Sequence, residues 1–166
     1  MPNPKELVIN TGPLIALVGA LEDLRILDSL YERVLVPHEV CQEIRAGGSH
    51  GFAVKEFEEA SWLEKCDAPL FIPPLLANSL DVGEAAVVQL ALNQQIQTVC
   101  IDEPRGRRFA RLSGLSVTGS IGILLHAKRE GYPLNISQAI LRMKEKGIWL
   151  SERVKAFALE HVDEKR

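Results

Sequence analysis

Four widely separated stretches of the sequence each place an oxygen-bearing side chain next to an apolar run. The four residues are Asn10, Glu43, Glu84 and Asp102. Oxygen donors with no histidine or cysteine among them favour a hard divalent ion, Mg²⁺ or Mn²⁺, over zinc. Such ions, held by a few carboxylates, activate water and neutralise the charge that develops on a phosphate during phosphodiester hydrolysis. The pattern therefore indicates metal-dependent phosphodiester chemistry, provided that the fold brings the four residues together.

The acids also have purely structural interpretations. Asp81 and Glu84 have the spacing of a capping box, which favours Asp81 as a helix cap and leaves both roles open for Glu84. Glu43 lies beside the apolar stripe of its predicted helix, whereas Glu39 is expected to point towards solvent. Asp102 ends an apolar strand and is the strongest single candidate.

A basic stretch follows Asp102 directly. Arg105 and Arg107 fall in the first turn of a predicted helix, where a cation is disfavoured unless an anion lies nearby. That anion is either Asp102 or Glu103, in a structural ion pair, or a substrate phosphate, which the guanidinium fork suits well. Glu103 is a further metal-ligand candidate, or it only neutralises the positive end of the helix. Ser120 offers a hydroxyl to the same cleft, although a turn and helix cap is favoured there.

Short β-type runs alternate with longer helical runs. Strands are predicted at residues 6–9, 33–36, 98–101 and 115–117, with an edge strand at 62–66. Helices are predicted from about residue 13, over 21–31, 37–46, 53–60, 81–92, 104–114 and 120–129, and from about residues 135 and 151, with 69–78 as a connector. This alternation predicts a three-layer α/β/α sandwich with a central parallel sheet. Functional groups in such sheets gather beyond the carboxyl ends of the strands, so we expect the four candidates to meet there.

Length and composition set the class of protein. The 166 residues suit a single domain, and we expect residues 135–166 to form a C-terminal helical extension packed on it or at an oligomer interface. With a net charge of −3, nucleic-acid binding must rely on a local basic patch. Three cysteines, odd in number and set among apolar neighbours, indicate reduced core residues. No run is long enough for a membrane helix and no signal peptide is recognisable, so we expect a cytoplasmic protein.

Four stretches in order carry a family resemblance. They are VINTGPLIAL, VPHEVCQEI, LDVGEAAVVQLAL and CIDEPRGRRFARLSGLSVTGSIGILLHAKREG, and together they run from about residue 7 to 131. The sequence resembles the PIN-domain family, in particular a small prokaryotic branch of predicted nucleic-acid-binding proteins similar to VapC-type toxin ribonucleases. The resemblance implies an α/β/α fold, a Mg²⁺- or Mn²⁺-dependent ribonuclease acting on single-stranded RNA, a homo-oligomer, and an antitoxin partner where the protein is a toxin.

Carried over by position, the family's first acid falls on Asn10 and its Ser/Thr neighbour on Thr11. The second acid falls on Glu43, the third on Glu84, and the fourth on Asp102 or Glu103. Asn10 departs from the family pattern, because an amide oxygen ligates a cation without adding negative charge or accepting a proton. Opposite charges about 4 Å apart interact by about 4 kcal/mol at an effective dielectric constant of about 20, so the lost charge weakens a metal site considerably.

Three hypotheses follow. In the first, a PIN-type endoribonuclease holds its metal with Glu43, Glu84 and Asp102, helped by Asn10. Its substrate phosphate is held by Arg105, Arg107, Thr11 and Ser120. In the second, the domain binds nucleic acid or a protein but Asn10 has disabled catalysis. The third, a small-molecule phosphohydrolase, is weaker because the first strand lacks a nucleophilic-aspartate motif.

Overall fold

A single parallel sheet organises the chain. The computed structural model describes residues 5–47 and 51–160, and within them five strands pair in the order β3-β2-β1-β4-β5, all parallel. The strands are β1 (Glu6–Ile9), β2 (Arg33–Val36), β3 (Leu63–Lys65), β4 (Thr98–Cys100) and β5 (Ser116–Thr118). The predicted parallel sheet is confirmed, including the edge position of β3.

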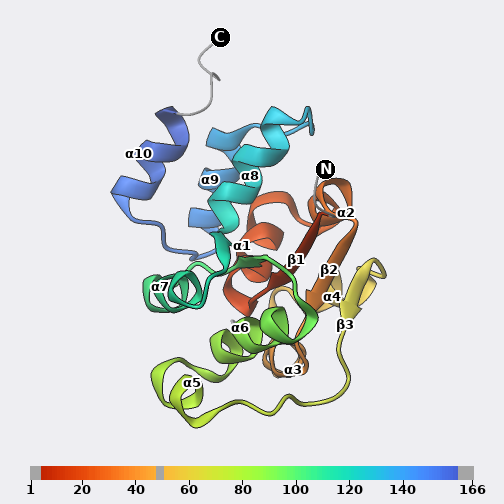
Figure 1. Ribbon diagram of the computed structural model, residues 1–166. Helices are drawn as coiled ribbons and strands as arrows, with labels where there is room; N and C mark the ends of the chain where they lie inside the picture. The colour runs from red at the N-terminus through yellow and green to blue at the C-terminus, as the bar shows by residue number, and fades with distance from the viewer. Residues whose placement is uncertain (1–4, 48–50, 161–166) are drawn as a thin grey trace.

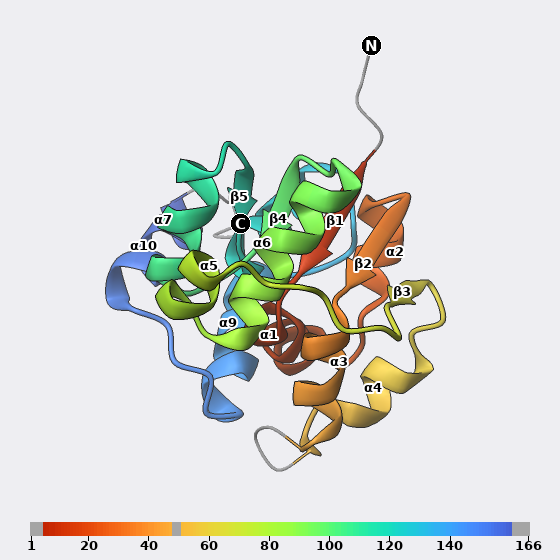
Figure 2. The same cartoon turned by 60° about the horizontal axis from the view of Figure 1, so that its bottom comes forward.

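Helices cover both faces of this sheet. Those in the described residues are α1 (Thr11–Leu21), α2 (Arg25–Leu30), α3 (His38–Arg45), α4 (Val54–Glu59), α5 (Pro74–Ser79), α6 (Val82–Gln94), α7 (Pro104–Leu112), α8 (Ser120–Arg129), α9 (Ile136–Glu145) and α10 (Glu152–Glu160). Helix α6 packs on β1 and β4 from one side, while α1, α8 and α9 pack together on the other (Figures 1 and 2). The predicted three-layer α/β/α sandwich is confirmed.

The central strands are apolar on both faces because both faces are covered. Leu7, Val8 and Ile9 of β1 are fully buried, as are Val99 and Cys100 of β4. A strand of an antiparallel sheet with one solvent-exposed face would alternate apolar and polar residues, and these two strands do not alternate in this way. After the polar first residues Glu6 and Thr98, the next polar side chains come where these strands end.

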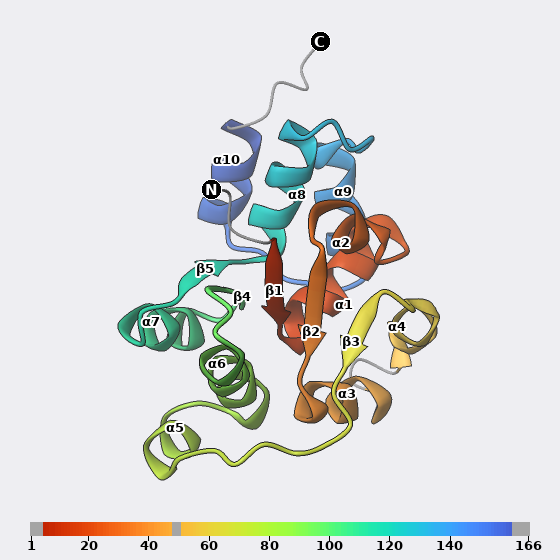
Figure 3. The ribbon, with the colours of Figure 1, turned by 45° about the vertical axis from the view of Figure 1, so that its right-hand side comes forward.

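The strand order reverses between β1 and β4. The chain begins in the middle of the sheet with β1, moves outwards through β2 and β3, and then returns to place β4 on the other side of β1. The backbone N–H of Asn10 donates to Cys100 O at 3.1 Å, so the two strand ends stay paired one residue beyond β1. Figure 3 shows β1 and β2 pointing towards the end of the molecule where α3 and α6 lie. That end is where doubly wound sheets bind ligands.

The predicted helix over residues 21–31 is wrong at its first turn. Helix α1 ends at Leu21, Glu22 adopts the left-handed conformation with φ of 69°, and α2 begins only at Arg25. The Asp23 carboxylate accepts a hydrogen bond from Arg25 N at 3.1 Å. A side chain that bonds the nearby backbone in this way competes with helix formation, and the apolar spacing of the segment could not reveal it.

The predicted connector over residues 69–78 is also wrong, because its second half forms helix α5. Pro74 occupies the first helical turn, and Pro73 precedes it at the N-cap. The fixed φ of proline suits these positions, so the Pro-Pro pair starts a helix and does not prevent one. Helix α1 likewise begins at Thr11, two residues before the predicted start, a difference that is ordinary for helix ends.

The C-terminal helices pack on the sandwich to different extents. Helix α9 lies along α1, and Gly19 leaves room there, since a Cβ at Gly19 would collide with Cδ1 of Ile148. In α10, which Ser151 caps by accepting from Val154 N at 3.1 Å, Ala158 is buried whereas Val154 and Phe157 are exposed. By helical spacing the sequence places residue 162 on the same apolar stripe, and that residue lies outside the described part of the chain.

Asp81 has the capping role that its spacing predicts. It stands at the N-cap of α6, and its Oδ1 accepts a hydrogen bond from Glu84 N at 2.9 Å. Helix α6 is apolar on nearly every side, and it packs on both central strands. The residue at which α6 starts therefore determines where the side chains of its first turn lie relative to the ends of β1 and β4.

Replacing Asp81 by Ala should lower the free energy of unfolding by about 1 kcal/mol, because Glu84 N loses its acceptor. Urea denaturation measures the change. Asp81→Asn is the matched control, since it removes the same charge and keeps an oxygen acceptor, and its unfolding free energy should stay within about 0.5 kcal/mol of wild type. Equal losses in the two variants would contradict the capping role.

Candidate active site

Asn10 brings a buried, unpartnered oxygen to the end of β1. The residue is 7% exposed, and its Oδ1 has no hydrogen-bond partner within the described residues. Asparagine at a helix N-cap usually bonds an N–H of the first turn, but this side chain does not cap α1. A buried polar atom without a partner costs about 1–3 kcal/mol, and this oxygen is free to accept a hydrogen bond or to ligate a cation.

Glu43 faces the same point as Asn10. Thr11 Oγ1 donates a hydrogen bond to Glu43 Oε1 at 2.6 Å, which fixes the acid of α3 against the first residue of α1. A Cβ on Gly83 would lie 2.9 Å from Asn10 Oδ1 and 3.0 Å from Glu43 Oε1. Glycine in the first turn of α6 therefore leaves room for both oxygens. Reasoning from sequence overlooked Gly83, although a glycine inside a helix of good helix formers is a signal in itself.

Glu84 is the most deeply buried acid of this end of the sheet. It is 4% exposed, and burial raises the pKa of its carboxyl above the ordinary value, with the charges of Asp81 and Glu103 acting in the same direction and that of Arg105 opposing them. The carboxyl packs on α7, since a Cβ on Gly106 would lie 3.1 Å from Glu84 Cδ. A buried carboxylate in acidic surroundings needs a compensating positive charge to stay ionised.

Asp102 turns its carboxylate towards the start of α8. Ser120 N donates to Oδ1 at 2.8 Å and Ser120 Oγ donates to Oδ2 at 2.9 Å. Gly119 occupies the N-cap of α8 and has no side chain, so Asp102 caps this helix from a distant part of the sequence. The residue as a whole is exposed, but burial of the carboxylate raises the pKa of Asp102, while the two bonds from Ser120 and the charge of Arg107 lower it.

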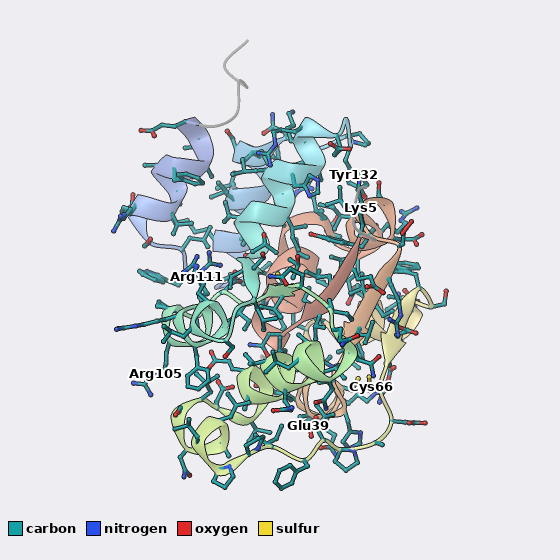
Figure 4. All side chains as sticks on the ribbon, viewed as in Figure 1. Lys5, Glu39, Cys66, Arg105, Arg111 and Tyr132 are labelled. Carbon is teal, nitrogen blue, oxygen red and sulfur yellow. The ribbon has the colours of Figure 1, made fainter. Side chains whose placement is uncertain are left out.

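The two arginines have different surroundings. Arg107 Nη1 donates to Ile101 O at 2.8 Å and lies against Gly119 beside Asp102, so its guanidinium is held within the protein. Arg105 is exposed and makes no hydrogen bond or ion pair with another described residue, and Figure 4 shows it extending away from α7. Arg105 is therefore the free cation of the two, and its charge is close enough to Glu84 to act on that acid.

The four predicted residues thus lie at one end of the sheet in two groups. Asn10 and Glu43 meet at Gly83, whereas Asp102 meets Ser120 and Arg107 at Gly119. Glu84 connects the groups, because it follows Gly83 in the chain and packs on Gly106, the residue before Arg107. No three His, Cys, Asp or Glu side chains in residues 5–47 and 51–160 lie close enough to hold a metal ion on their own.

The sequence matches the model of a known protein family. A family model described as PIN domain matches residues 6–164. The chain belongs to the PIN-domain family. The match extends beyond residue 131, where the resemblance seen in the sequence ends, and takes in α9 and α10. No curated protein matches the sequence. Among the described helices, none has the length and apolarity that a membrane span requires.

Membership of the PIN-domain family indicates a nuclease-type or nucleic-acid-binding function, and PIN domains generally use divalent metal ions. The donor chemistry here fits such an ion. Asn10 Oδ1 is buried and accepts no hydrogen bond from the residues that the structure describes, and a Glu43 oxygen faces the same glycine. Amide and carboxylate oxygens are the ligands that hard divalent cations prefer. These residues fit a divalent cation by the chemistry of their donor atoms and by their burial. The described acids do not by themselves form a group of three that could hold a metal ion.

Other side chains of the PIN domain have partners that their positions in the sequence did not suggest. Glu39, predicted to point to solvent, is half-buried and accepts a hydrogen bond from Leu70 N at 3.0 Å, so that prediction is wrong. Thr11 and Ser120, predicted to hold a phosphate, donate their hydroxyls to Glu43 and Asp102. Glu103 is exposed at the N-cap of α7 and makes no side-chain capping bond.

Glu84→Gln should make the metal-free PIN domain more stable at neutral pH. Because the pKa of Glu84 is raised from the ordinary value of 4.5, the folded state binds this proton more tightly than the unfolded state. The contribution of Glu84 to stability is therefore present below pH 4.5 and is lost as the pH rises through the raised pKa. Glutamine keeps the size and removes the titration.

Urea unfolding in EDTA at a series of pH values from about 4 to 8 measures this difference. The free energy of unfolding of Glu84→Gln minus that of wild type should increase with pH. Glu59→Gln, an exposed acid on α4, controls for the general loss of one charge. A difference that does not change with pH would contradict the raised pKa.

Proposed function

We propose that this PIN domain is a divalent-metal-dependent endoribonuclease. The observation that carries the proposal is the buried, unpartnered Oδ1 of Asn10, which faces Gly83 together with Glu43 Oε1. These amide and carboxylate oxygens lie against the same glycine, the first has no hydrogen-bond partner among the described residues, and both are donors of the kind that a hard divalent cation prefers. The nuclease-type or nucleic-acid-binding function of the family supports the same conclusion.

Each residue has a separate task in this proposal. A bound Mg²⁺ or Mn²⁺ supplies Lewis-acid polarisation of the scissile phosphate. Asn10, Glu43, Glu84 and Asp102 are the residues that would hold the ion. Glu84 would depend on it most, because burial and the charges of Asp81 and Glu103 disfavour its ionised carboxylate, and a cation lowers the cost of its ionisation.

The substrate assignment rests on the distribution of positive charge. The chain has a net charge of −3, so a polyanion must be bound locally. Helix α7 carries Arg105, Arg108 and Arg111 exposed, and none of them forms an ion pair with another residue that the structure describes. Arg105 lies near the candidate site, because its positive charge opposes the burial that raises the pKa of Glu84. It is the residue best placed to hold a substrate phosphate.

A second candidate is a PIN domain that binds nucleic acid or a protein without cleaving it. Asn10 favours this candidate, because a neutral amide replaces the first acid of the family pattern at a buried position. An antitoxin partner, a toxin role and a homo-oligomer stay predictions from the family resemblance. The two candidates differ in one measurable respect, which is turnover of RNA in the presence of a divalent ion.

Purified protein should cleave single-stranded RNA in Mn²⁺ or Mg²⁺ and lose this activity in EDTA. Glu43→Gln should lower kcat/KM by at least about tenfold, because a neutral amide replaces one charged ligand. Glu130→Gln, an exposed acid beyond the end of α8, should cleave like wild type. Gel analysis of labelled RNA measures the rates. Cleavage that persists in EDTA would exclude the proposed function.

Asn10→Asp separates the two candidates. The new carboxylate would stand beside Glu43, so Mn²⁺ affinity measured by calorimetry should increase at least about tenfold, equivalent to about 1.4 kcal/mol. An inactive wild type with an active Asn10→Asp variant would establish the second candidate. No gain in Mn²⁺ affinity would show that the missing charge at residue 10 does not limit the site, and would remove the reason for that candidate.

A further inference from the structure

Ser120 is buried and bonds the carboxylate of Asp102. It is the first residue of α8 and is 1% exposed. Its N–H and its hydroxyl both donate to the Asp102 carboxylate, one to each oxygen, at 2.8 and 2.9 Å. A hydroxyl so enclosed and already donating to Asp102 is unable to bind a substrate phosphate as well. Ser120 is therefore not placed to hold a substrate phosphate, and it is not the predicted helix cap either, because Gly119 stands at the N-cap of α8.

The surroundings of this carboxylate are closely shaped. A Cβ on Gly119 would lie 2.6 Å from Asp102 Oδ1 and 2.8 Å from Arg107 Nη1, so only glycine leaves the acid and the arginine in place. Arg107 is itself held by its bond to Ile101 O at 2.8 Å. The exposed residue Asp102 thus has Arg107 of α7 and the first turn of α8 beside its carboxylate, and the two bonds from Ser120 hold that carboxylate in one orientation.

The two bonds orient Asp102 without using up its capacity as a ligand. Each carboxylate oxygen has two lone pairs, and Ser120 occupies one on each. A free aspartate side chain samples several rotamers, and a cation that binds it must first select one of them. Hydrogen bonds to a ligating group remove that cost in advance, which is why partners of metal ligands affect affinity strongly.

We propose that Ser120 is a positioning residue of the cation site, which acts by holding the Asp102 carboxylate in its ligating orientation. The inference rests on the proposed function, because it assumes that Asp102 contributes to a divalent-ion site. It adds the first turn of α8 to that site. It also reassigns Ser120 from the substrate phosphate to Asp102.

Mn²⁺ titration by calorimetry, without RNA, tests the proposal. Ser120→Ala should bind Mn²⁺ about tenfold to a hundredfold more weakly than wild type. Ser120→Thr, which restores a hydroxyl, should recover most of the affinity. Ser113→Ala is the matched control, since Ser113 Oγ donates to Phe109 O at 3.0 Å at the far end of α7 and the same atoms are lost. Its affinity should equal that of wild type.

Circular dichroism and urea unfolding establish that each variant is folded. If Ser120→Ala does not fold, Ser120→Cys replaces it, because a thiol keeps the volume and donates only weakly, and its affinity should also fall. A folded Ala or Cys variant that binds Mn²⁺ as tightly as wild type, or more tightly, would overturn the role of Ser120 and leave the proposed function standing. A wild-type protein that does not bind Mn²⁺ would overturn both.

Discussion

The pairing of β1 with β4 determines where Asn10 and Asp102 lie relative to each other, and the other candidate ligands come from helices packed around these strands. Val8 pairs with Val99 and Ile9 with Cys100, so both strands end at the same height and Asn10 emerges beside the residues that lead to Asp102. In a parallel sheet a slip of one residue would turn the side chains to the opposite face. The apolar strands, buried on both faces, and helix α6 across them fix this register, and the polar residues follow from it.

Much of this arrangement could be predicted from the sequence, because local patterns determine it. Unbroken apolar runs of three or four residues specify buried parallel strands, and the residues that follow them must meet at one end of the sheet. Asn10 and Asp102 were placed in this way. The cap formed by Asp81 is predicted by its spacing to Glu84. Each prediction depended on residues that are close together in the chain.

The partners of the acids could not be predicted, because they come from distant segments. Thr11 and Glu43 are 32 residues apart, and Ser120 and Asp102 are 18 apart, so no spacing rule links them. A glycine inside a helix, such as Gly83, stands out in the sequence, but the side chains for which Gly83 and Gly119 leave room are known only from the packing of distant elements. The hydroxyls of Thr11 and Ser120 are predicted phosphate ligands from the sequence, and only the fold shows that they donate to Glu43 and Asp102.

Anomalous diffraction from a wild-type crystal soaked in Mn²⁺ tests the central claim, that the oxygens at the end of β1 hold a divalent cation. We predict a manganese peak within about 2.5 Å of Asn10 Oδ1 and of a Glu43 oxygen. Peaks only at exposed carboxylates away from this end of the sheet, such as Glu58 or Glu152, would contradict it.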